Sequence, residues 1–225
     1  QENFDQRYEE LCLSFQKIKK KLFNQSHALI NLTCDQKDVA AFRAEAEKWQ
    51  TFLGQETYDA STLPFKASKK NIGITCPSQV QYVCQMANVH QLGFKFDGSF
   101  DLLYQYLTTS YLWDNIRVKG GAYGCHLSFD RLIGSLSLCS YRDPRLEETL
   151  AVYDGIAEAI ENLNFTQEEL DKLLIGTVGR LEGVLTASQK GNIALRLHLS
   201  GVDYQLRCQR RRELLDCDLE RLRSY

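Results

Sequence analysis

The sequence predicts an α+β fold, with a mostly antiparallel sheet and helices packed on one face. Two alternating runs surround a short turn within residues 124–143, which is typical of a β-hairpin. Further alternating runs lie upstream of residue 87, and segments with helical periodicity lie on both sides of the hairpin. This order of strands, helix, hairpin and helices favours helices packed on a mostly antiparallel sheet.

The first 57 residues predict a helix, a strand and a second helix. Residues 4–22 place apolar side chains at alternating spacings of four and three, which is typical of an amphipathic helix. Residues 27–34 alternate and predict a strand. Asp35 can cap the next helix, whose apolar stripe ends at Phe52 before Gly54. We interpret residues 1–57 as the end of one domain, 58–69 as a linker without periodicity, and 70–225 as a second domain.

The second domain begins with two predicted strands, at residues 71–75 and 79–86. A helix is predicted over residues 99–116, and the hairpin turn at residues 130–134. The inward-facing residues of this helix would be Leu102, Leu103, Tyr106 and Leu107.

Helices are predicted for the remainder of the chain. Asp143 and Pro144 supply an N-cap and a proline at the first helical position. Residues 166–169 form a capping box that opens a helix to about residue 184, and helical pattern continues from about residue 187. No further strand is predicted after the hairpin.

Composition and charge exclude several classes of protein. The 225 residues are 44% hydrophobic and 25% charged, as in ordinary globular domains. A net charge of −2 argues against a nucleic-acid partner, and no apolar run is long enough for a membrane span. The chain begins at Gln1 without an initiator Met, so we expect a piece of a longer protein.

The eight cysteines show no CxxC and no zinc-knuckle spacing. We therefore expect reduced, structural cysteines in an intracellular, reducing compartment. Three N-x-S/T triplets, which are glycosylation acceptors in secreted proteins, argue against an intracellular compartment, but such triplets often arise by chance.

One short stretch, IRVKGGAYG at residues 116–124, combines a cation and a phenol with three glycines. Gly120 and Gly121 allow backbone conformations that a Cβ forbids, so Arg117 and Tyr123 can lie close together at one sheet edge. The alternative is a structural turn, in which Arg117 offsets the negative end of a helix and Tyr123 packs.

The wider context resembles a known family. The segment YLWDNIRVKGGAYG, the hairpin, SYRDP, FTQEELDKLLIGTV and the SQKG at residues 188–191 resemble, in order, the last domain of the presequence proteases. These belong to the pitrilysin and insulinase superfamily of zinc peptidases. The resemblance covers about residues 70–200, and residues 1–57 look like the closing helix, strand and helix of the preceding domain. The resemblance also implies a final strand, which we expect the domain at residues 70–225 to lack.

The resemblance implies a chain of four homologous domains that forms two halves around a closed chamber. Zinc is expected in the first domain, where it polarises the attacked carbonyl and activates water. Arg117 and Tyr123 are the expected catalytic residues of this chain, reaching the scissile peptide from a substrate loop that contains Gly120, Gly121 and Gly124. Expected partners are the N-terminal half of the same polypeptide and unstructured peptides, in an organelle matrix or the bacterial cytoplasm.

No zinc ligands are expected in this chain, because none of its four histidines opens an H-x-x-E-H motif in either orientation. The full-length protein is thus predicted to be a zinc metalloendopeptidase that degrades unstructured oligopeptides, and the fragment alone to be inactive. The alternative is a non-catalytic scaffold or assembly homologue of the same superfamily. Retention of both Arg117 and Tyr123 favours the enzyme.

Overall fold

A computed structural model describes residues 3–55 and 71–225, and the chain divides into two compact units. One unit contains the described residues up to Ile72 together with Leu185–Arg196, and the other contains Gly73–Val184 and Leu197–Tyr225. The predicted linker at residues 58–69 lies outside the described residues, so the proposed boundary stays a prediction.

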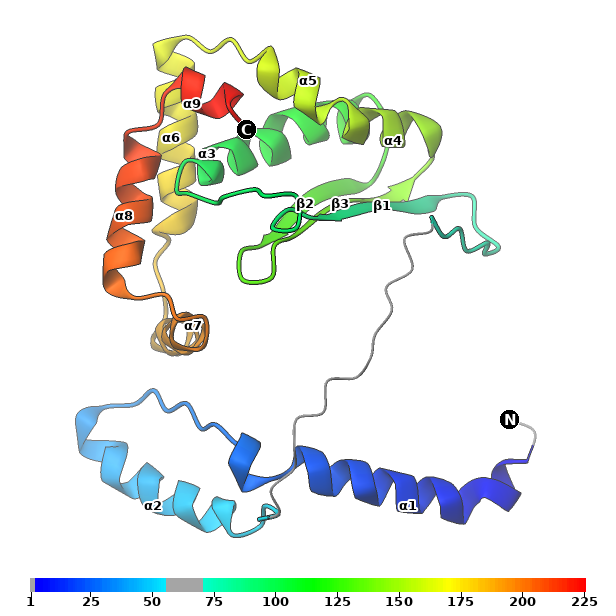
Figure 1. Ribbon diagram of the computed structural model, residues 1–225, viewed down its shortest axis with the longest axis vertical. Coiled ribbons are helices and arrows are strands. Elements are labelled where there is room, and N and C mark those ends of the chain that lie inside the picture. The colour runs from blue at the N-terminus through cyan, green and yellow to red at the C-terminus, as the bar shows by residue number, and fades with distance from the viewer. Residues whose placement is uncertain (1–2, 56–70) are drawn as a thin grey trace. The chain divides into compact units, whose positions relative to one another are not determined.

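The first unit is built on two helices, α1 (Phe4–Leu22) and α2 (Val39–Gln50), as predicted (Figure 1). Two short 3₁₀ turns lie between them, at Gln25–His27 and Gln36–Asp38. Most of α7 (Ala187–Leu199) belongs to this unit, and the Asn31 amide donates a hydrogen bond of 3.1 Å to the Gly191 carbonyl.

Two predicted strands do not form, at residues 27–34 and 71–75. The absence of the first corrects the helix–strand–helix interpretation of residues 1–57. Residues 28–34 and 71–75 are neither helix nor strand. A strand needs a partner for its backbone N–H and C=O groups, and alternation alone does not supply one. The named strands in the part of the chain that the structure describes all belong to one sheet in the other unit.

That sheet has three antiparallel strands in the order β1-β3-β2. They are β1 (Gln81–Asn88), β2 (Gly124–Asp130) and β3 (Ser135–Asp143). The hairpin prediction is confirmed, because β2 and β3 pair in register from Gly124 opposite Tyr141 to Asp130 opposite Ser135. The mixed α+β class is confirmed with it.

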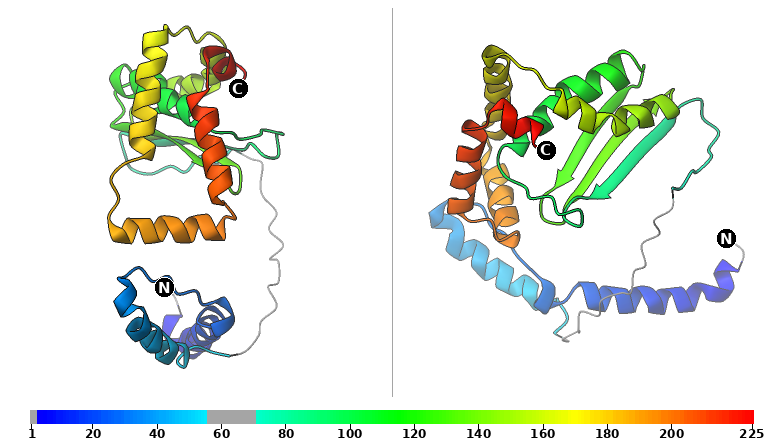
Figure 2. Two further views of the ribbon diagram at one scale, coloured as in Figure 1. Left: turned by 90° about the vertical axis from the view of Figure 1, so that its left-hand side faces the viewer. Right: turned by 45° about the horizontal axis from the view of Figure 1, so that its top comes forward.

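Helices cover one face of the sheet (Figures 1 and 2). The long predicted helix begins as α3 (Phe100–Tyr106) and continues through π-helical segments at Leu107–Tyr111 and Trp113–Val118. Next to it lie α4 (Glu147–Asp154) and α5 (Ile156–Glu161). The core between helices and sheet includes Leu102, Leu103, Leu112, Ile116, Val83, Leu127 and Leu138.

The start of α4 differs from the prediction. Asp143 is not the N-cap of the helix and Pro144 is not its first residue. The helix begins at Glu147, with Leu146 in the N-cap position. The fully buried Asp143 carboxylate instead accepts hydrogen bonds from the Arg145 backbone N–H at 2.9 Å and the Thr149 hydroxyl at 2.7 Å. These two bonds satisfy a buried charge and fix the turn between β3 and α4.

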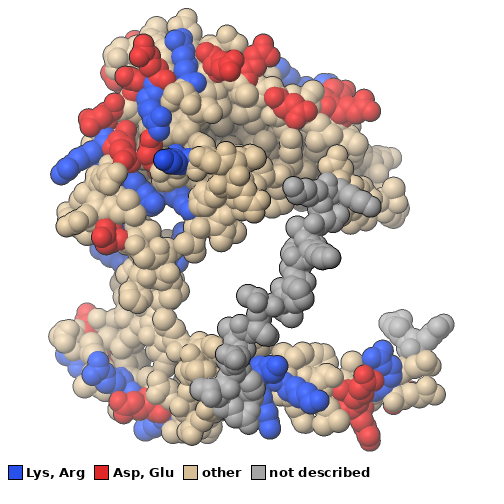
Figure 3. Space-filling view, viewed as in Figure 1, with Lys and Arg blue, Asp and Glu red and all other residues tan. Residues whose placement is uncertain are grey.

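The remaining helices are α6 (Gln167–Leu181), α8 (Tyr204–Leu215) and α9 (Leu219–Arg223). The predicted capping box is present: the Thr166 hydroxyl accepts from the Glu169 backbone N–H, and the Glu169 carboxylate accepts from the Thr166 backbone N–H. On the face shown in Figure 3, acidic and basic side chains are interspersed over the unit that contains the sheet. None of the helices within the described ranges is long and apolar enough to span a membrane.

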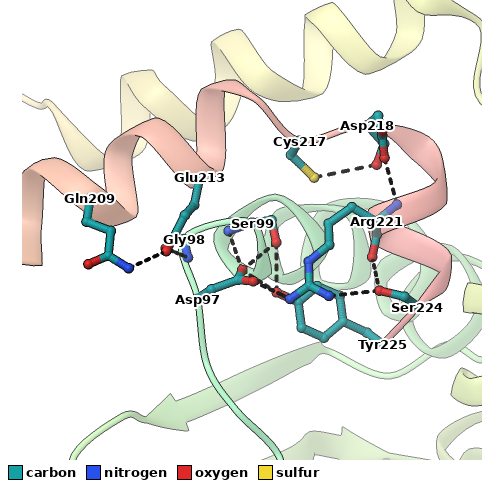
Figure 4. Close-up of polar contacts among 10 residues, drawn as sticks. All are labelled: Asp97, Gly98, Ser99, Gln209, Glu213, Cys217, Asp218, Arg221, Ser224 and Tyr225. Atoms are coloured by element: carbon teal, nitrogen blue, oxygen red, sulfur yellow. Dashed lines mark hydrogen bonds and ion pairs between the residues drawn. The ribbon is translucent and has the colours of Figure 1, made fainter.

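A partly buried polar cluster holds α9 against the segment that precedes α3 (Figure 4). The Asp97 carboxylate accepts hydrogen bonds from the Ser99 backbone N–H at 2.8 Å and from the Tyr225 hydroxyl at 2.5 Å, and it pairs with the Arg221 guanidinium. Burial opposes ionisation of Asp97, but these hydrogen bonds outweigh it and hold the pKa of its carboxyl below the ordinary value.

We expect Asp97→Asn to loosen α9 in a pH-dependent manner. Because the pKa of Asp97 is lowered by folding, its contribution is complete above the unfolded pKa of about 3.9 and is lost as the pH falls through the folded pKa. At pH 7 the variant should lose about 1 kcal/mol of local stability, or roughly fivefold in hydrogen exchange of α9. The difference from wild type should shrink near pH 3. Asp216→Asn, which removes an exposed carboxylate next to α8, is the control; an equal effect at both pH values would contradict the role of the Asp97 charge.

Candidate active-site loop

The loop between the π-helical segment and β2 is shaped by two glycines. Gly121 has a positive φ of 81°, in the left-handed region that favours glycine. A Cβ on Gly120 would lie 2.4 Å from the Ile116 carbonyl oxygen. That oxygen accepts a hydrogen bond of 3.1 Å from the Ala122 N–H, so the chain folds tightly back on the helix end. Gly124 is different, because a Cβ there would meet nothing within 4 Å.

The tight loop brings Arg117 and Tyr123 together, as the glycine pattern predicts. The Arg117 guanidinium donates a hydrogen bond of 2.7 Å from Nη1 to the Tyr123 backbone carbonyl. It also lies over the Trp113 ring, 4.3 Å from the centroid, and 5.9 Å from the centroid of Tyr123. Both Arg117 and Tyr123 are exposed, with 64% of Tyr123 accessible.

The arginine is therefore a positioned cation on the surface. The π-helical segment places Trp113 and Arg117 on the same side, and π-helical turns frequently occur at functional sites. The positive charge of Arg117 also acts on a residue of the hairpin. Burial raises the pKa of the Cys125 thiol, and the Arg117 charge opposes this rise. A guanidinium that keeps free N–H groups beside an exposed phenol can donate hydrogen bonds to developing negative charge on oxygen.

Two tyrosines that the sequence analysis did not single out extend this site across the sheet. Tyr123 packs edge-to-face on Tyr141 with ring centroids 5.5 Å apart, and Tyr141 packs in the same way on Tyr82 at 5.3 Å. Strand register could have found Tyr141, because it lies opposite Gly124 in the predicted hairpin. Trp113 could have been found only by placing it four residues before Arg117 on one helix face.

The described residues do not form a metal site. Among them, no group of three or more His, Cys, Asp or Glu side chains is placed to hold a metal ion. His126, beside the loop, is exposed on β2. The polar side chains that the loop itself brings together are the guanidinium of Arg117 and the phenol of Tyr123.

Comparisons with known proteins give consistent results. Residues 71–225 match the family model described as the PreP C-terminal domain. The chain is 33% identical to presequence protease 1, chloroplastic/mitochondrial, of Arabidopsis thaliana, over 98% of its own length and 21% of that protein. It is 30% identical to protein HypA of Clostridium perfringens, over 94% of its own length and 22% of that protein.

A solved protease from Helicobacter pylori has a similar fold, with a TM-score of 0.57 at 16% identity over 85% of this chain and 49% of that one. The chain thus spans about one fifth of the length of the Arabidopsis and Clostridium relatives.

Proposed function

Because this chain belongs to the family of the PreP C-terminal domain, we propose that it is the C-terminal part of a zinc metalloendopeptidase that degrades unstructured oligopeptides in a closed chamber. In this proposal, residues 1–57 end the preceding homologous domain, 58–69 form a linker, and 70–225 form the last domain. The zinc ion belongs to the N-terminal part of the protein, and the chain alone is inactive. The relatives named presequence proteases support an organelle matrix as the location.

The observation that carries the proposal is the Arg117–Tyr123 pair. Hydrolysis of a peptide bond places negative charge on the former carbonyl oxygen, and donors fixed beforehand stabilise it most effectively. Arg117 is held by Trp113 and by the Tyr123 carbonyl, yet its side chain remains exposed. Tyr123 presents its hydroxyl from an exposed ring. In this proposal both groups donate hydrogen bonds to the substrate oxygen.

Exposed apolar side chains on the first unit are evidence that a large partner covers it. Along α1, Phe4, Tyr8, Phe15, Ile18 and Leu22 are each at least half exposed, although their spacing is that of a buried stripe. We propose that the N-terminal half of the same polypeptide covers this face. The relatives, which are about five times longer, provide enough chain for such a half.

Metal removal tests the proposal in the full-length protein. We expect a chelator to abolish cleavage of an unstructured, quenched fluorescent peptide, and added zinc to restore it. The same chelator saturated with zinc is the control, and a tightly folded domain that carries the same cleavage sequence should resist because it cannot enter a chamber. Cleavage that persists in protein shown to be metal-free would contradict the zinc requirement. Absence of cleavage with every metal tested would support the alternative, a non-catalytic scaffold or assembly homologue of the same superfamily.

A further inference from the structure

Two cysteines on neighbouring strands have their sulfur atoms in contact. Cys84 of β1 lies directly opposite Cys139 of β3 in the sheet register. Their Sγ atoms are 3.0 Å apart, close enough for a thiol–thiol hydrogen bond. All eight cysteines lie in the described part of the chain and all are free thiols there, and this is the pair whose sulfurs are within hydrogen-bonding distance.

The geometry of the strand pair suits a covalent bond. Residues directly opposite in an antiparallel pair have Cα atoms about 4.5–5.5 Å apart, within the range of about 4.4–6.8 Å found across disulfides. The S–S bond is about 2.05 Å long, so each sulfur has to move by only about half an ångström through a small side-chain rotation. No change in strand register is needed.

The pair is also accessible to a reagent. Cys84 is exposed and Cys139 is half-buried. Their neighbours on the same strand face, Tyr82 and Met86, are 64% and 67% exposed, whereas Val83, which points to the helix-covered face, is 4% exposed. The thiols therefore lie on the side of the sheet that the helices of this unit leave open.

We propose that Cys84 and Cys139 are a reversible redox pair that forms a cross-strand disulfide when the protein meets a peroxide. The Cys84 thiolate attacks the peroxide, one oxygen is transferred to sulfur as a sulfenic acid, and hydroxide leaves. The Cys139 sulfur then attacks the sulfenic sulfur, the S–S bond forms, and water leaves. The two thiols lose two electrons, hydrogen peroxide gains them, and a dithiol reductant reverses the reaction.

The assignment of roles follows from the surroundings of each sulfur. Cys84 is the more exposed thiol and meets the oxidant first. Burial and the hydrogen bond to Cys84 raise the pKa of Cys139 to about 11, so Cys139 is the poorer nucleophile for the first attack on the peroxide. On the same face of the sheet, the new bond would join β1 to β3 beside the facing residues Tyr82 and Tyr141. Oxidation would then fix the strand pair that carries Tyr82 and Tyr141, and Tyr141 contacts Tyr123.

The experiment uses the full-length protein treated with limiting hydrogen peroxide. Remaining thiols are blocked by alkylation, and the protein is digested without reduction and mapped by mass spectrometry. We expect a linked pair of peptides that contain Cys84 and Cys139, with their summed mass less two hydrogens, and loss of this species after a dithiol reductant. In Cys139→Ser, Cys84 should instead be trapped as a sulfenic acid that a dimedone probe labels. Cys76→Ser, which removes an exposed cysteine upstream of β1, should leave the link unchanged.

Circular dichroism of each variant shows whether the fold is intact, and the mapping of the wild-type protein does not depend on any variant folding. Recovery of Cys84 and Cys139 as separate alkylated peptides, under conditions that oxidise other exposed cysteines such as Cys34 and Cys76, would overturn the proposal. So would a link between Cys84 and any other cysteine in place of Cys139.

Discussion

Replacing Arg117 by alanine in the full-length protein is expected to lower kcat for peptide cleavage about 10²- to 10³-fold, the usual cost of losing one donor to a developing oxyanion. Because such a donor acts mainly in the transition state, KM should change much less than kcat. Arg117→Lys keeps the charge but loses the planar fork that contacts the Tyr123 carbonyl, so it should retain only part of the activity.

The variant Tyr123→Phe distinguishes the contribution of the hydroxyl from that of the packed ring. The ring and its edge-to-face contact with Tyr141 remain, while the O–H donor is lost. We expect a fall in kcat of similar size to that of Arg117→Ala. In the double variant, kcat should fall by less than the product of the two single effects, because both donors serve one oxygen in the proposed mechanism and Arg117 also holds the Tyr123 backbone.

Steady-state kinetics with a quenched fluorescent peptide at matched zinc content measures these effects. Arg207→Ala and Tyr204→Phe, both exposed residues of α8, are the matched controls and should retain wild-type rates. A wild-type kcat in both Arg117→Ala and Tyr123→Phe would show that the loop is only a structural turn. A fall in kcat/KM through KM alone would place the two residues in substrate binding and not at the transition state.

Local patterns in the sequence were enough to predict the elements whose contacts lie close along the chain. The hairpin of β2 and β3 and the capping box at Thr166 each depend on neighbours within a few residues, and both are confirmed. The strands predicted at residues 27–34 and 71–75 alternate equally well, but alternation reports only which face is apolar and not whether a partner strand is present. These two strand predictions are wrong for that reason.

The same distinction applies to the site. Glycines at positions 120 and 121 beside Arg117 and Tyr123 predicted that these two residues lie close together, because tight turns leave a clear sequence pattern. The aromatic residues around them are different. Tyr82 contacts Tyr141 from a strand that lies more than fifty residues upstream, and only the observed β1–β3 pairing shows this contact. The π-helical geometry that carries Arg117 has no simple sequence signal either.

The loop glycines should differ sharply in how they tolerate alanine. A Cβ on Gly120 would meet the Ile116 carbonyl oxygen at 2.4 Å, so Gly120→Ala must displace backbone that also accepts the Ala122 N–H. We expect a loss of about 1–3 kcal/mol in unfolding free energy. Gly121→Ala should cost about 1–2 kcal/mol, because its φ of 81° lies in the left-handed region. Gly124→Ala should be near neutral, since a Cβ there has open space.

If the loop positions the catalytic donors, the effects on activity should exceed those on stability. Moving Tyr123 by about 1 Å can cost about 10²-fold in rate. Gly120→Ala and Gly121→Ala should therefore lower kcat at temperatures where both variants are fully folded, while Gly124→Ala keeps most of its activity. Thermal unfolding and kinetics of the same preparations distinguish the two effects. Variants at positions 120 and 121 that are less stable yet turn over at the wild-type rate would show that the tight turn serves the fold alone, and the loop would then have no part in placing Arg117 and Tyr123 for catalysis.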